Sequence, residues 1–195
     1  MKRSLICFLI LSVSLMLIAC KQGNQHPLSA TNASVTTAES TIPATEENVR
    51  AEKTQLHFYQ GSNKTTANAT LFSGDGYSIY IFEDNWNLRS DSVNEYSVTV
   101  WQNTTNEDAM LWVIKMDTTD LSTVQSWIRD SFTEYDFVED NRGGLGGTNA
   151  DGHVLDAQIK WADDIAYVLL KMYALEDAET FGVLLNVMAD TLLLT

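Results

Sequence analysis

The chain has 195 residues and is strongly acidic, with 26 Asp and Glu against 12 Lys and Arg and a formal net charge of −14. Nucleic acids and anionic lipid heads are bound through clustered Lys and Arg, so this charge excludes nucleic acid as a partner.

The first twenty residues have the pattern of a secretory signal peptide. Lys2 and Arg3 precede an uncharged, mostly apolar run over residues 4–18. This run is shorter than the ~20 residues that a transmembrane helix needs. It closes on Leu17-Ile18-Ala19-Cys20, which resembles the bacterial lipobox. The resemblance implies that residues 1–19 form a lipoprotein signal peptide and are removed.

Lipidation of Cys20 is the consequence of that resemblance. It implies that fatty acyl chains such as palmitate hold the protein on the extracytoplasmic face of a bacterial cell membrane. The other cysteine, Cys7, would leave with the signal peptide. The mature chain would then have neither a disulfide, nor a cysteine-based metal site, nor a free thiol nucleophile.

Residues 20–55 are predicted to be the lipidated cysteine and a flexible tether. The segment is rich in Ser, Thr, Ala, Asn and Glu, and it contains no aromatic residue. Such a composition cannot bury enough apolar surface to offset the entropy of ordering, so we expect disorder. A coil of this length has an end-to-end distance of roughly 30 to 40 Å.

Residues 56–195 are predicted to form one globular domain, because all five Trp and all seven Tyr lie there. Alternating or continuous apolar runs predict strands over residues 56–60, 67–72, 77–82, 95–102, 110–116, 153–161 and 165–175. Within these, Trp161 is expected to point inward. The glycine-rich residues 143–147 are expected to form a flexible loop.

Two helices are predicted from apolar residues at helical spacing. The first follows the capping residues Asp117-Thr118-Thr119, and the second begins at Glu176-Asp177. The expected buried stripe of the first consists of Leu121, Val124, Trp127, Ile128 and Phe132. That of the second consists of Phe181, Leu184, Leu185, Met188 and Leu192.

The order strands, helix, strands, helix predicts an α+β fold in which an antiparallel β-sheet is flanked by helices. The β-rich residues 76–81 and the following Trp86 resemble the opening of PsbP-like domains, where a glycine and a β-run precede a proline-containing turn and a tryptophan. The resemblance implies a PsbP-like α/β/α sandwich. That fold includes photosystem subunits, a nuclear-import factor and many bacterial lipoproteins of unknown role, so it implies no function.

Catalytic and metal-binding motifs are not found in the sequence. His26, His57 and His153 lie in no known motif, and neither a Gly-x-Ser-x-Gly elbow nor a His-Glu-x-x-His pair occurs. We therefore expect no catalytic residue, no metal site and no cofactor. The carboxylates between residues 136 and 156 are open to two interpretations, a calcium site or solvated loop residues.

Trp86 and Trp101 are the candidate ligand-binding residues. With the neighbouring Asp84, Asn87 and Asn103 they would form a platform for a sugar or a peptide. The alternative for both tryptophans is a place in the core.

Two functions remain open. The first is a non-catalytic binding or accessory module of the cell envelope, with an envelope protein, a glycan or a peptide as its ligand. The second is an extracytoplasmic hydrolase that uses a carboxylate pair.

Overall fold

The computed structural model describes residues 50–93 and 96–195. The predicted signal peptide, Cys20 and most of the predicted tether lie outside this range. None of the helices within it is long and apolar enough to cross a bilayer. The strands of the first half are β1 (Lys53–Gln60), β2 (Asn63–Gly74), β3 (Tyr77–Phe82), β4 (Trp86–Val93), β5 (Tyr96–Asn103) and β6 (Met110–Met116). Then come α1 (Leu121–Ser131), β7 (Tyr135–Glu139), β8 (Leu145–Asn149), β9 (His153–Ala162), β10 (Ile165–Ala174), α2 (Val183–Asp190) and β11 (Leu193–Leu194).

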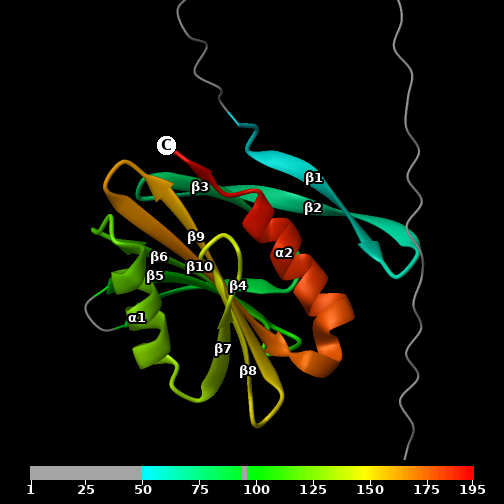
Figure 1. Ribbon diagram of the computed structural model, residues 1–195. Helices are drawn as coiled ribbons and strands as arrows, with labels where there is room; N and C mark the ends of the chain where they lie inside the picture. Colours follow the sequence, from blue (N-terminus) through cyan, green and yellow to red (C-terminus); the bar gives the residue numbers. More distant parts are fainter. Residues whose placement is uncertain (1–49, 94–95) are drawn as a thin grey trace, which may run out of the picture. The chain divides into compact units, whose positions relative to one another are not determined.

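The strands form two antiparallel sheets (Figure 1). The central sheet has seven strands in the order β4-β5-β6-β10-β9-β8-β7, and the small sheet has four in the order β1-β2-β3-β11. Most strands pair with their neighbour along the chain. The two long-range pairings, β6 with β10 and β3 with β11, join the first half of the domain to the second.

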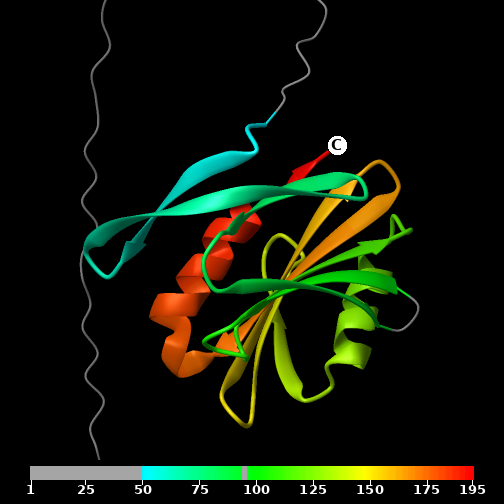
Figure 2. The ribbon, with the colours of Figure 1, turned by 180° about the vertical axis from the view of Figure 1, so that it is seen from behind.

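Both faces of the central sheet are covered, and β10 shows how. Val168 belongs to a core cluster that contains Ile128 of α1 on one face, whereas Leu169 belongs to a cluster that contains Leu185 of α2 on the other. Helix α2 also packs against β1 and β3 of the small sheet (Figure 2). The continuous apolar run of β10 reflects this double burial, as the sequence predicted.

The predicted antiparallel sheet is confirmed, but the domain contains more sheet than predicted. Strands β4, β7, β8 and β11 were missed, and the first three strands form a separate sheet together with β11. Residues 143–147 were expected to be a flexible loop, yet β8 begins at Leu145. Glycine is required here because a Cβ on Gly144 would lie 2.7 Å from the backbone oxygen of Ala157 on the neighbouring strand.

The helix starts also differ from the prediction. The N-cap of α1 is Asp120, whose Oδ1 accepts a hydrogen bond from the backbone N–H of Ser122 at 3.0 Å. The second helical segment begins with a 3₁₀ turn at Leu175–Asp177 and a π-helical turn at Ala178–Gly182, and only then becomes α2. Trp161 was predicted to point inward, but it is 40% exposed, because it lies near the tip of the β9–β10 hairpin.

Lys171 is a buried charge that the sequence pattern did not indicate. It lies in β10 among apolar residues and is 1% exposed. Its Nζ lies 2.7 Å from Oδ2 of Asp156 on β9 and donates a hydrogen bond to Oδ1 of Asn186 on α2. A polar contact therefore joins the central sheet to α2 beside the apolar cluster that contains Leu169 and Leu185.

Candidate ligand-binding site

The two tryptophans of the predicted platform lie in different environments. Trp101 is 3% exposed and packs edge-to-face against Phe72 of the small sheet, with ring centroids 5.1 Å apart. It is buried because β5 is an interior strand of the central sheet, and the small sheet covers the face of β5 that carries Trp101. The structure therefore removes Trp101 from the candidate site. Trp86 is half-buried at the start of β4.

Trp86 lines a hollow of about 200 Å³ that we call the aromatic pocket. Four segments distant in sequence build it: the β1–β2 hairpin, the β3–β4 turn, the β5–β6 loop and the π-helical turn with the start of α2. Its aromatic lining consists of Phe58, Phe82, Trp86 and Phe181. Its polar lining includes Asp84, Asn85, Asn103 and Thr105. The structure thus brings three of the predicted platform residues, Asp84, Trp86 and Asn103, into one pocket.

Asn103 is the polar residue most firmly fixed in this pocket. It is 4% exposed, and its Oδ1 accepts hydrogen bonds from the backbone N–H and the hydroxyl of Thr105, at 2.9 and 2.7 Å, and from Asn106 N at 3.1 Å. These bonds orient the side-chain amide. Within the described residues its Nδ2 makes no hydrogen bond, so its N–H groups are the donors left for a ligand.

The π-helical turn contributes to the lining of the aromatic pocket. It carries Phe181 into the pocket, and the preceding 3₁₀ turn is tied to the β5–β6 loop by a 2.8 Å hydrogen bond from Asn106 Nδ2 to Asp177 Oδ2. π-helical turns are rare in proteins, and those that occur are often found at functional sites. The π-helical turn and the hydrogen bond between Asn106 and Asp177 therefore fix the position of this part of the pocket lining.

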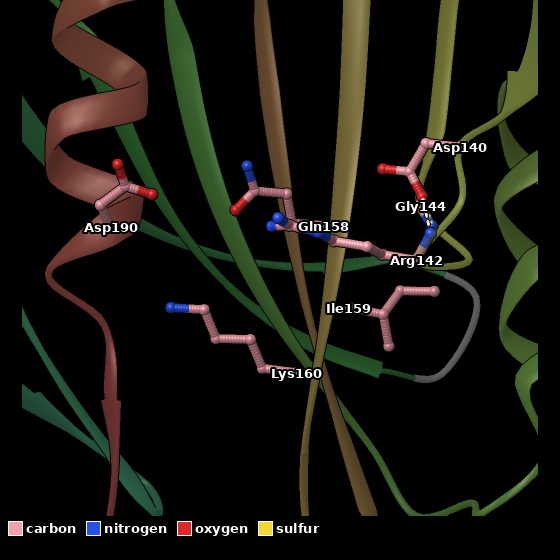
Figure 3. A pocket seen from close by; sticks show the side chains of 7 residues that line it. All are labelled: Asp140, Arg142, Gly144, Gln158, Ile159, Lys160 and Asp190. Carbon is pink, nitrogen blue, oxygen red and sulfur yellow. Dashed lines mark hydrogen bonds between the residues drawn. The ribbon is translucent and has the colours of Figure 1, made fainter. Parts of the chain in front are cut away.

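A second hollow, which we call the charged groove, has a volume of about 270 Å³. Its lining residues are Asp140, Arg142, Gly144, Gln158, Ile159, Lys160 and Asp190. Figure 3 shows Asp190 on the α2 side and Asp140 on the opposite side, with Gln158 between them. The side chain of Arg142 runs from the β7–β8 turn toward Gln158.

Two of the charges in the groove are held by the fold. Lys160 Nζ donates to the carbonyl oxygens of Ala189 and Leu192, at 3.3 and 3.1 Å, where α2 ends. Burial lowers the pKa of the Lys160 ammonium, and the nearby Asp190 carboxylate partly opposes that effect. On the other side, Asp140 Oδ1 accepts hydrogen bonds from the backbone N–H groups of the β7–β8 turn, including that of Arg142 at 2.7 Å.

The histidines do not assemble a catalytic or metal centre in the described part of the chain. His57 is exposed and lies 2.7 Å from the hydroxyl of Thr66. His153 Nε2 lies 3.5 Å from Asp108 Oδ2. In residues 50–93 and 96–195 no three His, Cys, Asp or Glu side chains are grouped so that they could hold a metal ion. The third histidine, His26, lies outside the described residues.

Sequence reasoning did not identify the charged groove or the role of Phe181. The groove residues come from a turn, a strand and a helix end that the chain pattern does not connect. One signal was available: Asp156, Gln158 and Lys160 alternate along β9 and mark a polar face. Phe181 was placed in the buried stripe of the last helix, whereas it is half-buried and lines the aromatic pocket.

Comparison with known proteins gives one structural neighbour to report. No family model and no curated protein match the chain. The fold is similar to the solution structure of cyanobacterial PsbP (CyanoP) from Synechocystis sp. PCC 6803, with a TM-score of 0.48 and 13% sequence identity, over 65% of this chain and 92% of that chain. The neighbour is of the PsbP type that residues 76–86 resemble. A similarity at this level carries no conclusion about function.

Proposed function

We propose that the protein is a lipid-anchored, extracytoplasmic binding module of the bacterial cell envelope, and that its aromatic pocket binds a sugar unit of a glycan. The observation that supports this most is the pocket itself. Aromatic walls that include Trp86 and Phe181 stand beside the buried amide of Asn103 and the carboxylate of Asp84. Flat apolar surface combined with a few fixed polar groups is typical of small-ligand sites.

A sugar fits this arrangement better than a purely apolar ligand does. One face of a pyranose ring presents C–H groups that pack on an aromatic ring, while its hydroxyls donate and accept hydrogen bonds at the rim. Asn103 supplies fixed donors and Asp84 supplies acceptors within the same hollow. An apolar peptide side chain would leave the N–H donors of the buried Asn103 amide unpaired, which costs binding energy.

Replacing Trp86 with alanine tests the proposed site. We expect the full-length chain to bind one of chitotetraose, cellotetraose or maltotetraose in calorimetry. We expect Trp86→Ala to weaken that binding at least about tenfold, since truncating a central aromatic contact costs about 2 kcal/mol or more at a hot spot. Trp161→Ala is the matched control, because Trp161 is exposed and does not line the pocket. Both variants should melt cooperatively.

Three outcomes would contradict the sugar-binding proposal. One is the absence of saturable binding to all three oligosaccharides. Another is equal affinity in the Trp86→Ala and Trp161→Ala variants. The third is steady hydrolysis of an oligosaccharide that Asp84→Asn abolishes, which would establish the hydrolase alternative instead.

The proposed anchor is tested separately at Cys20. The lipobox-like residues 17–20 support lipidation at this cysteine. We expect Cys20→Ser to move the protein from the membrane fraction to the soluble fraction, because a domain without its acyl chains keeps no durable hold on lipid. Cys7→Ser is the control and should fractionate like the wild type. Unchanged membrane association of Cys20→Ser would rule out the anchor.

A further inference from the structure

We propose that the charged groove is a second binding site, and that it binds a short unblocked peptide, with the peptide carboxylate at Arg142 and the peptide ammonium at Asp190. This site is distinct from the aromatic pocket, since the two hollows share no lining residue. The inference therefore does not depend on the sugar-binding proposal.

The charges of the groove balance, and this selects a dipolar ligand. Two cations, Arg142 and Lys160, and two anions, Asp140 and Asp190, line one hollow. Only seven Lys and Arg residues follow residue 55 in this acidic chain, so two in one groove concentrate much of the available positive charge. A phosphate dianion would gain the two cations but would also meet two carboxylates. A ligand with one positive and one negative end can place its carboxylate on Arg142 and its ammonium on Asp190, so that each end meets a charge of opposite sign.

Three side chains in the groove retain unused bonding capacity. Within the described residues, the side chains of Arg142, Gln158 and Asp190 make no hydrogen bond or ion pair. Arg142 offers a planar fork of donors that matches a carboxylate, and Gln158 offers both a donor and an acceptor beside it. Asp190 is an acceptor for an ammonium group. The neighbouring charges at Lys160 and Asp140 are already engaged with the backbone.

The placement of these groups favours a ligand whose two charged ends lie on opposite sides of the groove. Arg142 extends toward Gln158 from the β7–β8 turn, whereas Asp190 lies on the α2 side (Figure 3). The two charged ends of the ligand are therefore separated by the width of the groove. Each residue of an extended chain spans about 3.5 Å, so a dipeptide separates its ends by roughly 7 Å. Gln158, between the two sides, then faces the peptide bond.

Alanyl-alanine is the probe that tests this proposal. We expect the full-length chain to bind it saturably in calorimetry with a dissociation constant of about 1 mM or below, as for a small polar ligand. N-acetyl-alanyl-alanine lacks the ammonium and alanyl-alanine amide lacks the carboxylate. Each should bind at least about tenfold more weakly, because each leaves one charged group of the groove unpaired.

Arg142→Gln should weaken alanyl-alanine at least about tenfold, and Asp190→Asn should weaken it as well. Arg89→Gln removes the same charge from an exposed position of β4 outside the groove, and it should leave the affinity unchanged. Trp86→Ala should also leave it unchanged, which separates this site from the aromatic pocket. Melting curves check that each variant is folded.

Four results would overturn the proposal. They are the absence of saturable binding at about 50 mM alanyl-alanine, equal affinity for the blocked and unblocked peptides, displacement of the peptide by a lower concentration of inorganic phosphate, and loss of binding in Trp86→Ala.

Discussion

Asp156→Ala is expected to lower the free energy of unfolding by about 2 to 4 kcal/mol, because it leaves the charge of Lys171 buried without its ion-pair partner. Lys171 is 1% exposed, and its Nζ lies 2.7 Å from Asp156 Oδ2. Asn186 of α2 would be its remaining partner. The Asp156 side chain is 40% exposed, so the loss falls short of that for a fully buried pair.

The double variant Asp156→Ala with Lys171→Met distinguishes a buried charge from a lost contact. Methionine fills similar volume without a charge, so we expect it to recover at least half of the loss. Urea unfolding of the full-length chain, followed by tryptophan fluorescence, measures both variants. Asp75→Ala is the control, because Asp75 pairs with Lys115 at the surface and should change little. A double variant no more stable than Asp156→Ala would contradict this account.

Gly76→Ala is expected to destabilise the domain by about 2 to 4 kcal/mol, through backbone strain and overpacking together. Gly76 has a φ of +77°, and a Cβ at this position would overlap the hydroxyl of Tyr167. Tyr167 cannot move aside easily, because it is 2% exposed and its hydroxyl donates to the backbone oxygen of Asp75 at 3.2 Å.

Alanine substitutions at two other glycines distinguish the cost of backbone strain from the cost of steric overlap with Tyr167. Gly61 has a φ of +58° but nothing within 4 Å of its Cβ position, so Gly61→Ala should cost only the strain of about 1 to 2 kcal/mol. Gly146 has no positive φ and also has open space, so Gly146→Ala should be nearly neutral. Thermal and urea unfolding measure the series. Equal losses at Gly76 and Gly61 would show that Tyr167 yields without cost.

The strands with a clear apolar pattern could be predicted from sequence, and the polar ones could not. β6 and β10 are apolar on both faces because two layers cover them. β4 lies at an edge of the central sheet and alternates little, with polar residues through its middle. An edge strand needs no apolar face, so its existence depends on pairing with β5, which only the tertiary structure provides.

The candidate site was predictable only in part, for a related reason. Trp86, Asp84 and Asn103 lie near one another because β4 pairs with β5, and their proximity was inferred from short sequence spacing. Phe181 comes from a segment almost eighty residues further on. Trp101 was assigned by its strand face alone, and the cover over that face is a second sheet that local periodicity does not indicate.

Both ends of the folded domain attach to β3, and they do so at the same residue. Arg50 Nη1 donates to the backbone oxygen and the hydroxyl of Ser78, at 3.0 and 2.9 Å, and β11 pairs with β3 so that Leu193 lies opposite Ser78. Adjacent ends allow circular permutation. A short linker could join Thr195 to Arg50. The new termini could then be placed in the exposed turn at Gly61, between β1 and β2, without interrupting a strand. The domain could equally be inserted into a surface loop of a host protein.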